Sequence, residues 1–195
     1  MLLSDIDLTK EYTYADYAKW AIEERLEIIK GKVFTMSPAP GSLHQRISQR
    51  ISLKIGNYLN DKSCEIFSAP FDVRLPRLTG NDREIITVVQ PDICVICDPA
   101  KIDDKGCVGA PDIVVEILSP GNNKKELKNK YEVYEEAGVT EYWIIHPQEK
   151  TFLKYTLIDG SFVPSKLLTI GDDVTTPVLP GFVLNLDELF ADRKA

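Results

Sequence analysis

The sequence predicts a single α/β domain whose mixed central sheet is flanked by helices. Runs of β-branched and aliphatic residues alternate along the chain with segments whose apolar residues recur at helical spacing. No repeat, low-complexity tract or linker interrupts the 195 residues, and the hydrophobic content of 44% is enough for one well-packed core. We therefore expect one domain over residues 1–195.

Helices are predicted where apolar residues recur every three or four positions or where capping residues open a segment. The capping pair Thr13 and Asp16 opens the first helix, which we expect to run to about Glu24. Isoleucines at four-residue spacing mark a second helix that starts at Ser42. Gly138 suits the C-terminal end of a third helix. We expect this third helix over residues 123–137 and a final helical turn near 186–190.

Strands are predicted from runs of β-branched and aromatic residues bounded by turn residues. Residues 26–36 form the pattern of a hairpin that turns near Gly31. Polar segments containing glycine, at 77–83 and 99–110, are expected to be loops. The other strands are expected at 64–75, 84–89, 92–97, 111–118, 141–145 and 151–158, with a short β segment in the tail.

Composition and charge restrict the class of protein. No apolar stretch approaches the ~20 residues that span a bilayer, and the N-terminus lacks a basic region followed by an apolar core. We therefore expect a cytoplasmic protein with no membrane association. The net charge of −7 argues against an indiscriminate nucleic-acid coat protein. It does not exclude an enzyme that acts on phosphodiesters, because metal ions neutralise charge locally.

The four cysteines raise the question of zinc, because Cys94 and Cys97 have the spacing of a metal knuckle. That spacing lies in a predicted strand, where side chains three residues apart point to opposite faces. We therefore expect no structural zinc and a reducing compartment, with all four side chains as buried or free thiols. The four are Cys64, Cys94, Cys97 and Cys107.

Two carboxylates lie in apolar strands, where an ionised group is costly unless a cation or hydrogen bonds compensate it. Glu116 falls late in its apolar run, where a turn role is not available, so a functional role is favoured. Asp92 and Asp112 each follow a proline, where an aspartate often hydrogen-bonds to the backbone at the start of a strand. A structural role is therefore an alternative to a functional one for both. Asp112 is about 13 Å along the strand from Glu116 at ~3.3 Å per residue, too far to share an ion. A divalent metal between Asp92 and Glu116 on adjacent strands would explain both.

A set of short motifs occurs in a definite order along the chain. Gln90-Pro91-Asp92 is followed, after 23 further residues, by Glu116-Ile117-Leu118. The other segments are 26–31, 36–40, His44-Gln45, 115–120, Lys130 with Tyr134, and 138–143. Together they resemble the bacterial family of uncharacterised restriction-endonuclease-like proteins within the PD-(D/E)XK nuclease superfamily, over about residues 12–190.

The resemblance implies a restriction-endonuclease-like fold in which Asp92 and Glu116 bind Mg²⁺ or Mn²⁺. In such enzymes a lysine near the acidic pair supports the attacking water, but this chain has Leu118 at that position. The resemblance implies that the charge comes from the following helix, where Lys130 matches the family pattern. Helical geometry alone leaves both Lys130 and Lys124 as candidates, because each flanks the buried stripe.

Three further residues are site candidates. Glu27 is expected to complete the metal shell from an early element, and Gln90 to assist positioning, as the resemblance implies. His44 faces inward on its helix, although a core histidine that hydrogen-bonds to the backbone is the alternative. The complete set of catalytic candidates is Asp92, Glu116, Lys130, Gln90, Glu27 and His44.

The predicted function is a metal-dependent DNA endonuclease that hydrolyses phosphodiester bonds. Two alternatives stay open: a catalytically inactive nuclease-fold module for nucleic-acid binding or dimerisation, and a small-molecule phosphoesterase. Arg46, Arg50 and Lys54 form a stripe at four-residue spacing that contacts phosphates or only aids solubility. Exposed aromatic rings at Tyr142 and Trp143, and the habit of the family, predict a homodimer.

Overall fold

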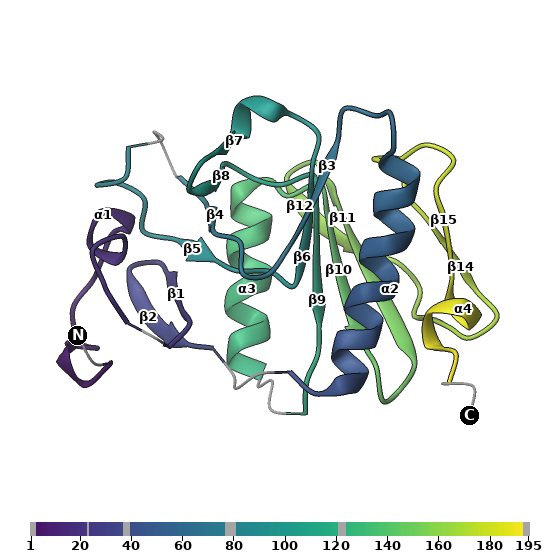
Figure 1. Ribbon diagram of the computed structural model, residues 1–195, viewed down its shortest axis with the longest axis horizontal. Helices are drawn as coiled ribbons and strands as arrows, with labels where there is room; N and C mark the ends of the chain where they lie inside the picture. The colour runs from purple at the N-terminus through teal and green to yellow at the C-terminus, as the bar shows by residue number, and fades with distance from the viewer. Residues whose placement is uncertain (1–2, 23, 37–39, 77–80, 121–123, 193–195) are drawn as a thin grey trace.

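The structure is a computed structural model that describes residues 3–22, 24–36, 40–76, 81–120 and 124–192, with the side chains of 124–126 excepted. Two long helices, α2 (Ser42–Leu59) and α3 (Lys124–Ala137), stand on opposite sides of a central sheet, and a second sheet lies on the α3 side (Figure 1). The shorter helices are α1 (Tyr14–Tyr17) and α4 (Leu186–Phe190). The mixed α/β architecture predicted from the sequence is confirmed.

The central sheet has the strand order β12-β11-β10-β9-β6-β3, and β13 pairs with β11. Strands β9 and β10 are parallel and are connected through α3, whereas the other neighbours are antiparallel. The strand bounds are β3 (Glu65–Ser68), β6 (Ile93–Ile96), β9 (Ile113–Ile117), β10 (Glu141–His146), β11 (Thr151–Ile158), β12 (Ser161–Pro164) and β13 (Leu168–Thr169). The sheet is therefore mixed, as the sequence predicts.

The second sheet has the order β2-β1-β5-β4-β8-β7 and carries the N-terminal hairpin. Its strands are β1 (Leu26–Ile29), β2 (Lys32–Thr35), β4 (Val73–Arg74), β5 (Val88–Val89), β7 (Ile102–Asp103) and β8 (Gly106–Val108). A separate pair near the C-terminus consists of β14 (Asp173–Thr175) and β15 (Val183–Asn185). The chain passes from β5 into β6 within three residues, so the second sheet adjoins the start of a central strand.

The alternation of side chains along β9 decides which face each residue occupies. Ile113, Val115 and Ile117 pack with the isoleucines of α2, and Val114 packs with the core under α3. Helix α2 buries its isoleucine stripe at positions 47, 51 and 55, as its periodicity predicts. Because Glu116 has the parity of Val114, its side chain points toward α3.

Several predicted boundaries are wrong. The first helix ends at Tyr17 and not near Glu24, although Thr13 and Asp16 form their capping bonds. Trp20 packs 5.0 Å from the ring of Tyr12, which precedes the helix, and this contact folds the chain back. The predicted strand 64–75 is split between two sheets at Pro70, which has no N–H for a strand ladder.

Two other predicted segments also differ from the structure. The strand expected at 84–89 is reduced to β5, because the preceding residues form turns. The loop expected at 99–110 contains the β7–β8 hairpin, which pairs with β4. Residues 77–80 of the other expected loop and residues 37–39 of the motif at 36–40 lie outside the described residues.

The expectation of four thiols is wrong, because Cys64 and Cys97 form a disulfide. The antiparallel register pairs Glu65 with Ile96, so the residues next to them come together across β3 and β6. Cys94 and Cys107 are free and buried. Spacing along the chain cannot reveal a pair that the sheet register creates.

The expectation of exposed rings at Tyr142 and Trp143 is also wrong. Both residues have no exposed surface, because β10 is an interior strand between β9 and β11 and has helices over both faces. Tyr142 packs edge-on against Tyr134 of α3, and Trp143 packs against Phe152. The exposed-ring argument for a homodimer therefore fails. Among the described residues, no helix is long and apolar enough to cross a membrane.

Candidate active site

Asp92 and Glu116 come from neighbouring antiparallel strands of the central sheet. Ile93 of β6 pairs with Val115 of β9, so the register continued by one residue sets Asp92 opposite Glu116. Glu116 contacts Lys130 and Tyr134 of α3, whereas Asp92, which directly precedes β6, contacts His44 of α2. The Oδ2 atom of Asp92 accepts a hydrogen bond of 2.8 Å from the backbone N of Ile117. Asp92 therefore lies beside the end of β9, near enough for its charge to act on Glu116.

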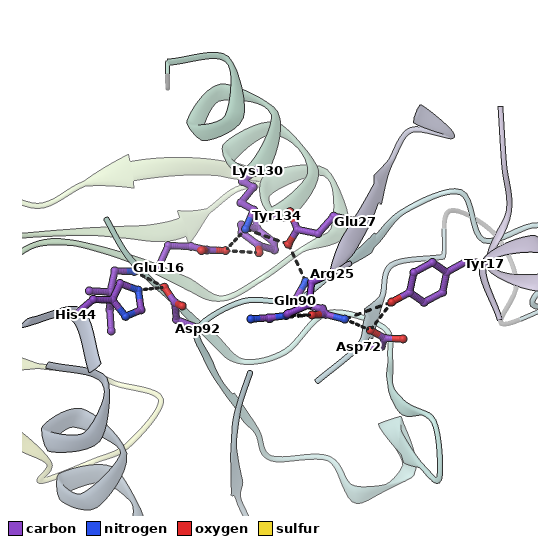
Figure 2. A network of polar contacts seen from close by, with 11 residues as sticks. Tyr17, Arg25, Glu27, His44, Asp72, Gln90, Asp92, Glu116, Lys130 and Tyr134 are labelled. Carbon is purple, nitrogen blue, oxygen red and sulfur yellow. Dashed lines mark hydrogen bonds and ion pairs between the residues drawn. The ribbon is translucent and has the colours of Figure 1, made fainter. Parts of the chain in front are cut away.

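Glu116 lies in a buried polar cluster under α3 (Figure 2). Its Oε1 atom accepts hydrogen bonds from Lys130 Nζ at 3.0 Å and from the Tyr134 hydroxyl at 2.8 Å. Burial raises the pKa of Glu116 to about 7; the Lys130 charge opposes this rise, and the Asp92 and Glu27 charges add to it. A carboxyl group with this pKa exchanges its proton near neutrality.

Lys130 is only 4% exposed and lies between two carboxylates. Its Nζ atom is 3.0 Å from Oε1 of Glu116 and 3.0 Å from Oε1 of Glu27. Burial opposes the charge of the ammonium, but the two carboxylates outweigh burial and hold its pKa well above the ordinary value. Lys130 is therefore a fixed cation. The side chain of Lys124, the alternative that helical geometry left open, lies outside the described residues.

Glu27 joins this cluster from β1 of the second sheet. Besides its contact with Lys130, its Oε1 atom accepts a hydrogen bond of 2.8 Å from the backbone N of Gln90. Glu27 thus connects the second sheet to α3 and to the segment before Asp92.

Tyr134 belongs to the same cluster, although no role was assigned to it from the sequence. It lies one helical turn after Lys130, and residues four apart share a helix face. Burial and the Glu116 charge hold the pKa of Tyr134 well above its usual range, so its hydroxyl stays a hydrogen-bond donor. The spacing to Lys130 was the available signal for Tyr134 as a site residue.

His44 contacts Asp92, and the backbone of Ile117 also interacts with its ring, as the structural alternative expected. The residue is 8% exposed in the first turn of α2, and its Nε2 atom lies 3.2 Å from Asp92 Oδ2. Burial lowers the pKa of His44, but the hydrogen bond and charge of Asp92 outweigh it, so the net shift is upward. The buried Nδ1 atom has no hydrogen-bond partner among the described residues. His44 therefore fixes one oxygen of Asp92.

The side chain of Gln90 takes part in a second network, directed away from His44 (Figure 2). Its Oε1 atom accepts bonds of 3.0 and 2.8 Å from Nε and Nη2 of Arg25. Its Nε2 atom donates to Asp72 at 2.8 Å and to the Tyr17 hydroxyl at 3.3 Å. Gln90 reaches the Glu116 cluster only through its backbone N. No pattern in the sequence pointed to Arg25, Asp72 or Tyr17.

The oxygens of Asp92 and Glu116 suit a hard divalent cation. One oxygen of each carboxylate is engaged, whereas Asp92 Oδ1 and Glu116 Oε2 have no hydrogen-bond partner among the described residues. Across those same residues, no cluster of three or more acidic, histidine or cysteine side chains is arranged to hold a metal. The donor set is therefore a carboxylate pair, which fits Mg²⁺ or Mn²⁺ because such ions are often held by one or two carboxylates plus waters and phosphates.

The basic stripe on α2 is largely engaged with the C-terminal helix. Arg50 Nη1 donates to the backbone oxygens of Leu189 and Ala191, both at 2.7 Å. Lys54 pairs with Glu188 at 3.1 Å. These contacts attach α4 to α2. The role of Arg50 is therefore neither of the two expected from the sequence, contact with phosphates or solubility alone.

Comparisons with known proteins agree with this fold. A crystal structure described as a putative nuclease belonging to DUF820, from Anabaena variabilis ATCC 29413, superposes with a TM-score of 0.73 at 21% identity, covering 92% of this chain and 98% of that one. Uncharacterized protein slr1290 from Synechocystis sp. is 27% identical over 121 residues, which are 61% of this chain and 60% of that protein. A family model described as "Uma2: Putative restriction endonuclease" matches residues 14–187. The chain therefore belongs to the Uma2 family, whose fold and motifs are those of restriction-endonuclease-like nucleases.

Proposed function

We propose that this protein is a metal-dependent endonuclease that hydrolyses phosphodiester bonds in DNA. One observation carries the proposal: Asp92, just before β6, bonds to the backbone next to Glu116 of β9, and a buried lysine contacts Glu116. Among the described residues, one oxygen of each carboxylate has no hydrogen-bond partner. Family membership supports nuclease chemistry. The metal dependence and the choice of DNA belong to the proposal.

Asp92 and Glu116 would hold Mg²⁺ or Mn²⁺ through their free oxygens. When bound, the ion supplies Lewis-acid stabilisation and makes water a stronger nucleophile near neutral pH. His44 and the backbone N of Ile117 both bond to Asp92 Oδ2, which leaves the other oxygen of Asp92 available for an ion. Because metal ligands must be deprotonated and the pKa of Glu116 is about 7, Glu116 would give up a proton to serve as a ligand at neutral pH.

Lys130 supplies the positive charge that the superfamily lysine supplies elsewhere. Its ammonium group is held by Glu27 and Glu116, so it is oriented before substrate arrives. A preorganised cation stabilises the charge that develops on a phosphate in the transition state without reorganisation. Glu27 acts in this proposal as the residue that positions Lys130, and Gln90 positions Glu27 through its backbone N.

A catalytically inactive nucleic-acid-binding module is the second candidate. It is favoured by Leu118, which occupies the position of the usual lysine and is buried among apolar residues under α3. It is also favoured by the two ion pairs of Lys130, because a cation with two carboxylate partners can serve structure alone.

The test compares wild-type protein with Asp92→Asn on plasmid and oligonucleotide DNA, with Mg²⁺, with Mn²⁺ and with EDTA. We expect wild-type cleavage that EDTA abolishes, and a loss of about a thousandfold or more in Asp92→Asn while the fold persists by circular dichroism. Asp159→Asn, in the exposed turn after β11, makes the same chemical change and should cleave normally.

Each of the other outcomes would assign a different function or a different site to this protein. DNA binding without cleavage under any metal condition would establish the binding module. Hydrolysis of a small phosphodiester such as bis-p-nitrophenyl phosphate, without DNA cleavage, would establish a small-molecule phosphoesterase. Cleavage that survives in Asp92→Asn would remove Asp92 from the machinery.

A further inference from the structure

A cavity of about 370 Å³ lies next to the candidate active site. Its size falls in the range of ligand pockets. The lining residues that matter here are Tyr17, Phe71, Asp72, Gln90, Asp104 and Lys105. A second cavity of about 350 Å³ shares Tyr17, Asp72 and Lys105. Asp72 and Tyr17 therefore stand between two hollows of the same surface.

Asp72 is held in place by a dedicated set of contacts. Its Oδ1 atom accepts bonds from Gln90 Nε2 at 2.8 Å and from the Tyr17 hydroxyl at 3.4 Å (Figure 2). Gln90 is 92% buried, and Arg25 fixes its amide by bonding to Oε1. Within the described part of the chain, Asp72 Oδ2 has no hydrogen-bond partner. The network thus presents one uncommitted acceptor at the cavity.

The backbone around Asp72 is also tightly constrained. Its carbonyl oxygen accepts a bond of 2.9 Å from Cys107 N. A Cβ added to Gly106, which has φ of +124°, would lie only 2.2 Å from that oxygen. Only glycine permits this approach, so the β7–β8 hairpin is pressed against Asp72. The acceptor is therefore part of a rigid wall.

Most charges around the cavity are paired among themselves. Arg74 bonds to Asp103, and Lys105 lies 3.0 Å from Asp82. Burial raises the pKa of Asp72, and the hydrogen bonds from Gln90 and Tyr17 oppose that rise. A carboxylate oxygen accepts hydrogen bonds and repels a phosphate group, so Asp72 suits a hydrogen-bond donor as its ligand.

Backbone contacts connect the cavity wall to the proposed metal ligands. Ala69, which begins the segment leading to Phe71 and Asp72, donates its N–H to the carbonyl oxygen of Asp92 at 3.0 Å. Gln90 lies two residues before Asp92, and its backbone N bonds to Glu27. The cavity wall and Asp92 thus lie in adjoining segments, so a strand whose phosphate is bound at Asp92 can extend toward the cavity.

We propose that the cavity binds one unstacked nucleobase with an amino group at C4 of a pyrimidine or C6 of a purine, cytosine or adenine, next to the phosphate that is cleaved. This proposal rests on the proposed nuclease function. Asp72 Oδ2 accepts a hydrogen bond from the amino group, a pairing by which acidic side chains recognise cytosine. The rings of Tyr17 and Phe71 supply surfaces on which a displaced base stacks. Thymine offers a carbonyl where the amino group would be and leaves the carboxylate unpaired.

The test measures equilibrium binding by fluorescence anisotropy in EDTA, so that it is independent of cleavage. The probes are 12-residue oligothymidylates whose central position is deoxycytidine, deoxyadenosine, thymidine or an abasic site. Since the strand can slide, the register of the site need not be known. Wild-type protein should bind the cytosine and adenine probes about fivefold or more tightly than the thymine and abasic probes.

Asp72→Asn should reduce this preference to less than twofold or reverse it, because the amide can present a donor to thymine. Asp104→Asn makes the same charge change in the same cavity; it should raise affinity for all four probes and keep the preference. Phe71→Leu keeps apolar contact with Phe67 and should bring the affinities of the cytosine and adenine probes closer to those of the thymine and abasic probes. This variant tests the site independently if Asp72→Asn does not fold.

The possible results separate this proposal from the nuclease proposal. Equal binding of all four probes by wild-type protein, absence of binding, or a preference that survives in Asp72→Asn would overturn the nucleobase site whether or not the protein cleaves DNA. A preference that disappears in Asp72→Asn supports the nucleobase site even if no metal-dependent cleavage is found.

Discussion

The ammonium nitrogen of Lys130 lies 3.0 Å from Oε1 of Glu116, and both groups are buried. In the motif Glu116-Ile117-Leu118, Leu118 occupies the position of the usual lysine. The contact brings a lysine to Glu116 from α3 instead. Leu118 packs in the apolar core under the same helix, so the strand carries no competing charge there. The cation of the site thus comes from a neighbouring helix, and its position depends on how that helix packs against β9.

The pKa of Glu116 predicts a specific dependence of stability on pH. Its folded-state pKa of about 7 exceeds the ordinary value of 4.5, so the folded protein holds a proton that the unfolded chain releases. The stability that the folded protein gains by keeping this proton is fully present below about pH 4.5 and is lost as pH rises through 7. Between pH 5 and 8, Glu116→Gln should gain stability relative to wild type, on the order of 3 kcal/mol. Urea unfolding at several pH values measures it, with exposed Glu149→Gln as control. Parallel profiles for wild type and Glu116→Gln would contradict the burial argument.

Tyr134→Phe removes one of the two donors to Glu116 Oε1 without changing the ring. Loss of a bond to the charged form raises the pKa of Glu116 further, so the pH midpoint of metal-dependent cleavage should shift upward. Stability at neutral pH should fall by about 1 kcal/mol. Tyr131→Phe, one turn earlier on α3, removes a hydroxyl that contacts Glu135 and should leave the midpoint unchanged. The same upward shift in both variants would assign the effect to α3 in general.

Lys130→Met should destabilise the fold strongly, because it leaves Glu116 and Glu27 buried without their shared cation. Breaking a buried pair from one side costs about 3–5 kcal/mol. Adding Glu27→Gln removes one of the uncompensated charges, so the double variant should be more stable than Lys130→Met alone. Chemical denaturation of the four proteins of this cycle measures the coupling. A double variant that is no more stable than Lys130→Met would mean that Glu27 is not charged in the cluster.

Arg50→Ala should loosen the C-terminal helix and not selectively weaken DNA binding. Its guanidinium bonds to the carbonyl oxygens of Leu189, in the last turn of α4, and of Ala191, the residue after α4. Loss of these bonds should cost about 1–2 kcal/mol, since bonds from a charged donor are stronger than neutral ones. Limited proteolysis of the C-terminal segment and thermal unfolding report the change. Arg46→Ala, one turn earlier on α2, is the matched control. A selective loss of DNA affinity in Arg50→Ala, with unchanged proteolysis, would restore the phosphate-contact role.

The sequence by itself determined the elements whose signals are local. Gly31, with φ of +82°, turns the first hairpin, and Gly138, with φ of +86°, ends α3 where predicted. The isoleucine spacing located α2, and the ordered motifs around Asp92 and Glu116 identified the family. These signals act over a few residues or are carried by the motifs themselves, so they can be read without knowing which strands are neighbours.

Only the tertiary structure decided which distant residues meet. The register of β3 with β6 joined Cys64 to Cys97, and the interior position of β10 buried the aromatic pair that the sequence analysis expected at the surface. The contacts of Asp72 with Tyr17 and Gln90 span three separate elements and leave no periodic trace in the chain. Such contacts follow from strand order and helix packing, which are settled by the burial of whole faces and not by any short run of residues.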